Sequence, residues 1–144
     1  MQSHRISAAL CLALLVASAG CGRKADTGTT TTTAGVRVTD VSIGRAIGGD
    51  KAITDATDTF KPNDTIYASV ATDGTAQSAT VRAKWTFEDG QVVSDSTRTI
   101  APNKAERTEF HISKPDGWPA GKYKVEVFLD NQAAGTKDFS VRAG

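Results

Sequence analysis

From residue 36 onward, apolar and polar residues alternate along the chain with a period of two. The clearest case is segment 79–87, where one face collects the side chains of Ala79, Val81, Ala83, Trp85 and Phe87. Such alternation is typical of a half-buried strand in an antiparallel sheet. The segment 88–91 follows, and its Asp-Gly pair accepts positive φ twice, which predicts a tight hairpin to the next strand.

Six further segments predict strands, at 36–47 with a break near Gly44, 65–72, 91–100, 106–113, 122–130 and 137–142. The segment 91–100 is polar, which predicts a position at the edge of a sheet. All four prolines fall in the turns between these segments. No segment after residue 21 shows the period of an amphipathic helix. Seven short strands in roughly 109 residues predict an all-β fold, an antiparallel β-sandwich.

The first 21 residues follow a different pattern, that of a secretory signal peptide. Arg5 precedes an apolar run at 6–17, and small residues follow at 18–20. The run is too short to cross about 30 Å of hydrocarbon as a helix, which takes about 20 residues. One interpretation is an ordinary signal peptide that ends near an incidental cysteine.

The other interpretation rests on Ser18-Ala19-Gly20-Cys21, which resembles the lipobox of bacterial lipoproteins. The resemblance implies a signal peptide at 1–20, cleavage between Gly20 and Cys21, and acylation of the Cys21 thiol. Ser18 departs from the family, which usually has Leu there. We expect the protein to lie at a cell membrane, where a palmitate-type lipid anchor holds it. Gly22 in place of Asp implies the outer membrane, facing the periplasm, if the source is Gram-negative.

The segment 21–35 contains no large apolar residue after the cysteine and is rich in threonine. It cannot bury enough surface to offset the entropy of ordering, so we expect a flexible linker. As a random coil it would span roughly 20 Å. The chain thus divides into a signal peptide at 1–20, a lipidated linker at 21–35 and a single folded domain at 36–144.

Composition narrows the function classes. The chain holds 17 Lys+Arg and 16 Asp+Glu, and loss of Arg5 with the signal peptide would leave the mature chain neutral. This balance argues against a nucleic-acid partner, which requires excess cationic charge. The only cysteines are Cys11 and Cys21, and the only histidines are His4 and His111. We therefore expect no disulfide in the domain, no metal site and no cofactor.

Two details of the domain resemble the immunoglobulin-like (Ig-like) fold. Trp85 is central in the third predicted strand, where that fold buries a tryptophan between its sheets. Gly121-Lys122-Tyr123, at the start of the sixth strand, resembles a tyrosine corner, in which the hydroxyl bonds to upstream backbone. Val125 stands where antibody domains have a cysteine, which favours the disulfide-free bacterial and fibronectin-type variants. The resemblance covers residues 36–144 and implies a fold rather than an activity.

Candidate catalytic groups are few. His111 would lie beside Glu109 on the solvent face of its strand, which is typical of a solvated histidine. Glu88 and Asp89 are neighbours at a strand end and would point apart, so they do not suit a glycosidase. A polar connection holds Asp50, Asp55, Asp58 and Asp64, which could alternatively supply calcium ligands. We expect no catalytic residues and no enzyme.

Exposed aromatic residues are the better candidates for ligand binding. Trp118 lies in a Pro/Gly-rich loop, where it could either plug the end of the sandwich or stack on a sugar. Tyr67 and Phe128 are out of phase with their strands and would form one outer patch if those strands were adjacent. We expect a membrane-anchored binding or assembly module for an envelope protein or glycan. The alternative is a carbohydrate- or peptidoglycan-binding module that uses Trp118.

Overall fold

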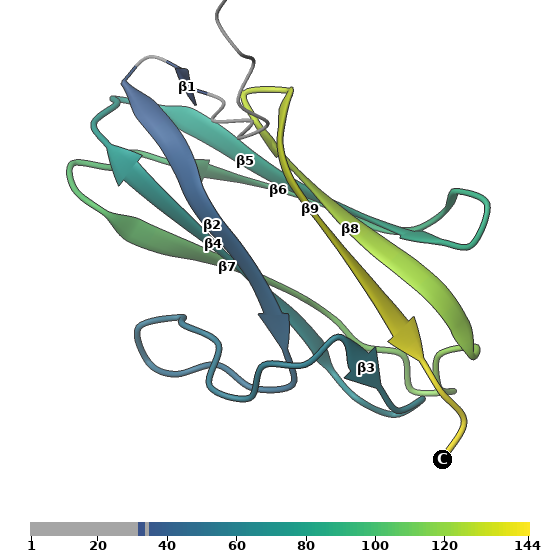
Figure 1. The fold of residues 1–144 in the computed structure, drawn as a ribbon. Coiled ribbons are helices and arrows are strands. Elements are labelled where there is room, and N and C mark those ends of the chain that lie inside the picture. Colours follow the sequence, from purple (N-terminus) through teal and green to yellow (C-terminus); the bar gives the residue numbers. More distant parts are fainter. Residues whose placement is uncertain (1–31, 34) are drawn as a thin grey trace, which may run out of the picture.

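The computed structural model describes residues 32–33 and 35–144, in which nine β-strands form two sheets (Figure 1). In chain order the strands are β1 (Thr32–Thr33), β2 (Val36–Gly44), β3 (Thr59–Phe60), β4 (Ile66–Gly74), β5 (Ala79–Phe87), β6 (Gln91–Ile100), β7 (Glu106–Ile112), β8 (Gly121–Leu129) and β9 (Gln132–Val141). One sheet has the order β1-β2-β4-β7 and the other β3-β9-β8-β5-β6. These residues form no helix, and hence no helix that could span a bilayer.

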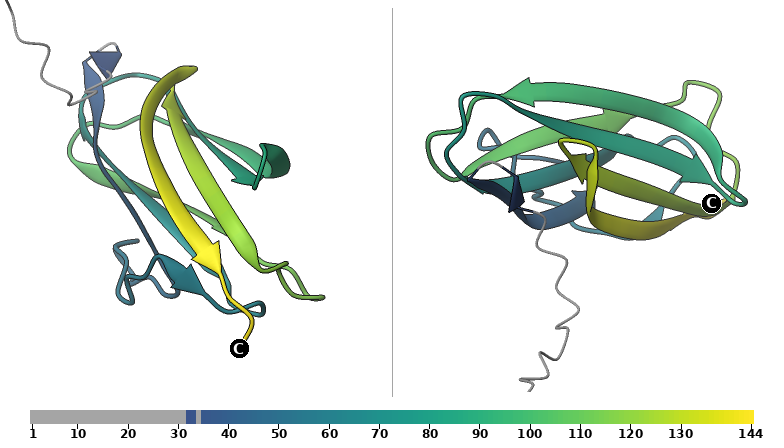
Figure 2. Two further views of the ribbon diagram at one scale, coloured as in Figure 1. Left: turned by 45° about the vertical axis from the view of Figure 1, so that its right-hand side comes forward. Right: turned by 90° about the horizontal axis from the view of Figure 1, so that it is seen from above.

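The strand order is that of an Ig-like sandwich, which confirms the predicted fold class. The two sheets lie face to face (Figure 2). The second and fifth long strands, β4 and β7, share one sheet, whereas the third and sixth, β5 and β8, share the other with β9. Immunoglobulin domains divide their B, E, C, F and G strands in the same way. The fourth long strand, β6, joins β5 at the sheet edge, as its polar sequence predicted.

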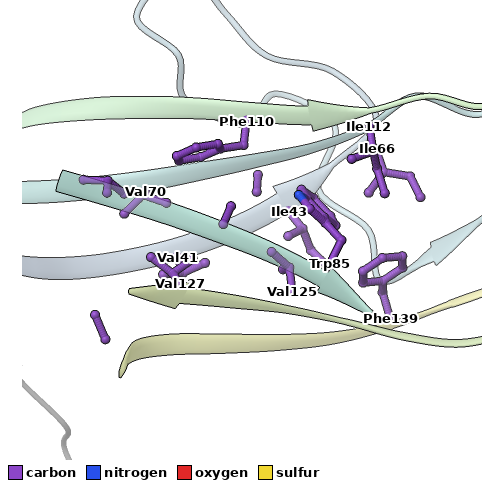
Figure 3. Close-up of a cluster of buried hydrophobic side chains, with 14 of the residues drawn as sticks. Val41, Ile43, Ile66, Val70, Trp85, Phe110, Ile112, Val125, Val127 and Phe139 are labelled. Carbon is purple, nitrogen blue, oxygen red and sulfur yellow. The ribbon is translucent and has the colours of Figure 1, made fainter. Parts of the chain in front are cut away.

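The alternating apolar residues meet between the sheets and form the core (Figure 3). Trp85 lies at its centre with 1% of its surface exposed, which confirms the predicted burial. Its ring meets Phe139 edge to face, at 5.9 Å between centroids. Phe139 comes from β9 and Trp85 from β5, which flank β8 on either side, so the contact joins strands that do not pair directly.

Two connections differ from the predicted ones. Strand β9 begins at Gln132, five residues before the predicted start at 137, because Asp130 and Asn131 form a two-residue hairpin with φ of 46° and 66°. Asp and Asn tolerate this left-handed conformation better than other residues with a Cβ. In the β5–β6 hairpin the positive φ values fall on Glu88 and Gly90, whereas the prediction placed them on Asp89 and Gly90. The loop therefore has three residues instead of two.

The short strands were not predicted, because two residues cannot show an alternating pattern. Thr32 and Thr33 of β1 pair with Arg37 and Val36 of β2, so strand pairing reaches into the predicted linker. The β3 strand pairs in parallel with the end of β9. Residues 1–31 and 34 lie outside the described part of the chain. They include the predicted signal peptide with Gly20, as well as Cys21 and most of the predicted linker, so these assignments stay predictions.

Candidate binding site

Trp118 closes one end of the sandwich. The loop between β7 and β8 holds it in place, because its backbone N–H donates to the carbonyl of Pro62 at 2.8 Å. The indole Nε1–H donates to the carbonyl of Asp64 at 3.2 Å. Only 7% of the residue is exposed. Of the two interpretations of this residue, the geometry favours the plug, since a buried indole presents no free face on which a sugar could stack.

Tyr123 forms the tyrosine corner that the sequence predicted. Its hydroxyl donates to the carbonyl of Pro119 at 2.7 Å, which ties the loop to the start of β8. The ring stacks on Phe139 at 5.3 Å and contacts Phe87 at 4.7 Å and Trp118 at 6.2 Å. Burial raises the pKa of this hydroxyl above its ordinary value, and the charge of Glu88 raises it further. The hydroxyl is therefore a structural donor.

A pocket opens beside these aromatic side chains, between the start of β6 and the loop before β8. Its volume is about 340 Å³, and its lining residues are Phe87, Gln91, Val92, Val93, Lys114, Trp118, Pro119 and Tyr123. Lys114 is the one charged residue among them. Val92, at its rim, is the one large apolar residue that is strongly exposed in the described chain, at 51%. An apolar pocket with a single cation at its edge suits an apolar group that lies near a negative charge.

Sequence reasoning named Trp118 but missed the rest of this pocket. Phe87 and Tyr123 were assigned to the core; Tyr123 belongs to it, and Phe87, which is partly buried, packs against it. Val92 and Val93 belong to a polar edge strand that suggested no site. The one available signal for this site was that Val92 and Val93 are adjacent apolar residues in an otherwise mostly polar strand. A bulge in the β5–β6 pairing, between Trp85 and Thr86, lies opposite this pair.

Tyr67 and Phe128 do not form a common patch. Tyr67 lies on β4 and Phe128 on β8, and these strands belong to different sheets. The Tyr67 ring lies 5.5 Å from that of His111, whereas the guanidinium of Arg82 lies over the Phe128 ring at 5.2 Å. Each aromatic residue is thus half-buried against a polar neighbour on its own outer face.

The remaining catalytic candidate, His111, has a local partner. His111 Nδ1 contacts the carboxylate of Glu109, and the His111 side chain is 52% exposed, as expected of a solvated strand residue. Ser69 lies opposite Glu109 in the strand register, but no base reaches its buried hydroxyl, which has no hydrogen-bond partner. Among the residues that the structure describes, no group of three or more His, Cys, Asp or Glu could hold a metal ion.

The acidic side chains of the connection between β2 and β4 also bond locally. Asp55 accepts two hydrogen bonds from Arg45, at 3.0 and 3.3 Å. Asp50 accepts from the backbone N–H of Ala52, and Asp64 from that of Lys61. Asp58 accepts from the hydroxyl of Thr59 at 3.1 Å. Each carboxylate thus bonds to another residue of the β2–β4 connection, which supports the interpretation of this segment as a polar connection.

No protein-family profile and no curated protein matches the sequence. Among solved structures, the chain is similar to an immunoglobulin-like protein from Pseudomonas aeruginosa, with 14% identity, 80% of this chain and 100% of that chain covered, and a TM-score of 0.48. It is also similar to a CARDB domain from Pyrococcus furiosus, solved in complex with di-metal ions, with 16% identity, coverage of 84% and 99%, and a TM-score of 0.43.

A third similar structure is the alkylpurine DNA glycosylase AlkC of Pseudomonas fluorescens bound to DNA. The identity is 19%, the TM-score is 0.44, and 72% of this chain is covered. The chain spans 30% of the length of that enzyme. The Ig-like class of this domain follows from its own strand order, its buried Trp85 and its tyrosine corner.

Proposed function

We propose that this chain is a lipid-anchored protein of a bacterial cell envelope, in the outer membrane if the cell is Gram-negative, whose Ig-like domain is a non-catalytic binding or assembly module. The observation that carries the proposal is Cys21 in its Ser-Ala-Gly-Cys context, after an apolar run and before a threonine-rich linker. Two acyl signals hold a protein stably at a membrane, whereas one gives marginal binding. The domain would then act at a membrane surface.

The position of the pocket supports this arrangement. The chain enters the sandwich at the start of β2, where Val36 lies opposite Gly74 of β4. The pocket lies beside Phe87 and Trp118, at the end of the sandwich where β5 finishes and β8 begins. The ribbon in Figure 1 shows the start of β2 at the opposite end. An anchor on the N-terminal side would therefore leave the pocket on the far end, facing away from the membrane.

A non-catalytic role is supported by the engagement of the polar groups. Nucleophilic catalysis needs a nucleophile within hydrogen-bond reach of a base. The imidazole of His111 contacts Glu109 instead, and the Ser69 hydroxyl has no partner in the described chain. The glycan-binding alternative centred on Trp118 has no comparable support, because that indole is buried.

The anchor is tested by substitution of Cys21. Cys21→Ser should abolish incorporation of labelled palmitate and release the protein from the membrane fraction, because the thiol that the lipobox presents for acylation is removed. Cys11→Ser is the matched control, since it removes the other cysteine within the predicted signal peptide and should leave both properties unchanged. Retention of Cys21→Ser in the membrane fraction, or a wild-type amino terminus without lipid in mass spectrometry, would contradict the anchor.

A further inference from the structure

The two long sides of the sandwich are protected to different degrees. On one side, β1 pairs with β2, and β3 pairs with β9, so both edge strands are partly covered. On the other side, β6 and β7 end their sheets, and no described strand pairs with their outer edges. The ten residues of β6 are mostly exposed. An open edge of this length presents a row of unpaired backbone donors and acceptors, which can accept a further strand.

The start of the β6 edge carries the apolar pocket. Val92 and Val93 line it, and Phe87 of the neighbouring strand contributes to its wall. A strand that paired with β6 would direct alternate side chains to the inner face, toward the space between the sheets. One of these side chains would reach the pocket. In this mode of recognition the backbone supplies affinity, and pockets for individual side chains supply specificity.

The end of the β6 edge carries positive charge. A hollow of about 590 Å³ lies there, between the end of β6 and the start of β7. Its charged lining residues are Lys51, Arg98, Lys104 and Arg107 on the basic side and Asp50 and Glu106 on the acidic side. No described carboxylate forms a salt bridge with any of the four basic residues. The excess of cations favours an acidic partner.

Arg98 connects the two edge strands without neutralising its charge. Its Nε donates to the carbonyl of Glu109 on β7 at 3.4 Å, and its guanidinium lies over the ring of Phe110 at 5.8 Å. By contrast, a hollow beside β9 is lined by two cations and two anions, Lys122, Arg142, Asp58 and Asp138. The uncompensated positive charge is therefore a property of the β6–β7 side rather than of every hollow on the surface.

We propose that the β6 edge docks an extended segment of a partner protein, which adds to the sheet as a strand antiparallel to β6. The antiparallel direction is chosen because such ladders are the more stable per residue. Acidic side chains of the segment lie at the basic hollow, and one bulky apolar side chain fills the pocket. Because the two sites are about seven residues apart along β6, or roughly 24 Å, the acidic residues precede the apolar one by a similar number. This inference rests on the proposed binding function and assigns its site and its class of partner.

The test is an affinity selection of a random peptide library on the full chain in detergent. Enriched peptides should contain acidic residues followed, about seven residues later, by one large apolar residue. Binding should protect the amides of β6 from hydrogen exchange. Val92→Glu and Lys104→Glu should each weaken binding by about tenfold, since one places a charge in the pocket and the other reverses a charge of the hollow.

Matched controls lie on β9, at the opposite edge of the same sheet. Thr136→Glu and Lys137→Glu make the same charge changes there and should stay within about twofold of the wild-type affinity. All four residues are exposed, with Val92, Thr136 and Lys137 on strands and Lys104 in the β6–β7 connection, so circular dichroism should report an unchanged fold.

Several results would overturn the β6 site. The selection could enrich no peptides, or it could enrich peptides in which acidic residues do not precede an apolar one. Alternatively, the Val92→Glu variant could bind the enriched peptides as tightly as the wild type does. A dimer in sedimentation equilibrium that Val92→Glu dissociates would instead assign the edge to a second copy. Binding of polygalacturonate that depends on Lys104 but not on Val92 would assign the hollow to an anionic polysaccharide. These last two outcomes remove the docking strand while the proposed binding module stands, and the Cys21 experiment tests the anchor separately.

Discussion

Replacement of Trp85 by alanine tests the core on which the whole domain depends. The side chain is 1% exposed and contacts Phe139 edge to face. Its truncation removes roughly 150 Å² of buried apolar surface, which corresponds to about 4 kcal/mol at about 25 cal/mol per Å². Because the rigid sheets on either side cannot collapse fully into the space, part of a cavity should remain. We expect a loss of about 3–5 kcal/mol in the free energy of unfolding.

Urea unfolding followed by circular dichroism measures this loss. A domain of this size has a total stability of about 5–15 kcal/mol, so this loss would be a large fraction of it. Val92→Ala is the matched control, because Val92 is 51% exposed and its truncation should cost no more than about 0.5 kcal/mol. Trp85→Phe should fall between the two. A cost below about 1 kcal/mol for Trp85→Ala, with an unchanged denaturant slope, would refute the burial of this side chain.

Two further predictions concern ionisable groups. The raised pKa of the Tyr123 hydroxyl means that, as pH rises, the unfolded chain releases this proton before the folded chain does, so the free energy of unfolding should fall above about pH 10. In urea titrations, the Tyr123→Phe variant should not show this fall. It should also be less stable by about 1 kcal/mol, because it lacks the hydrogen bond to Pro119. The Arg82 hydrogen bonds, at 2.7 and 2.5 Å, lower the pKa of Asp95, so the stability this pair contributes is present above the ordinary aspartate pKa and is lost as pH falls. In an NMR titration, Arg82→Gln should raise the pKa of Asp95 more than the control Lys84→Gln does, because the charge of Lys84 has only a minor effect on this pKa. Equal shifts in both variants would contradict Arg82 as the main cause of the lowered pKa.

Strand positions and their inner faces could be predicted from the sequence, because a strand with one buried face must alternate with period two. This held for β5, whose predicted and observed bounds coincide, and for the polar edge strand β6. The tyrosine corner was also predictable, since Pro119 and Tyr123 are close in the chain and the motif is local. The two-residue loop of the β8–β9 hairpin was missed because left-handed Asp130 and Asn131 are less evident in a sequence than an Asn-Gly pair.

The candidate site depended on contacts between distant parts of the chain. Alternation shows which face of a strand is apolar, but not which strand lies beside it. Only the sheet order separates Tyr67 from Phe128, and only the packing of the Trp118 loop against Pro62 and Asp64 decides that the indole is buried. The lipobox at Cys21 is the opposite case, because it is a contiguous motif that can be read without a fold. The sequence by itself thus determined the strand faces and the predicted anchor, whereas the tertiary structure decided the pocket and the open edge, since long-range pairing leaves no local pattern.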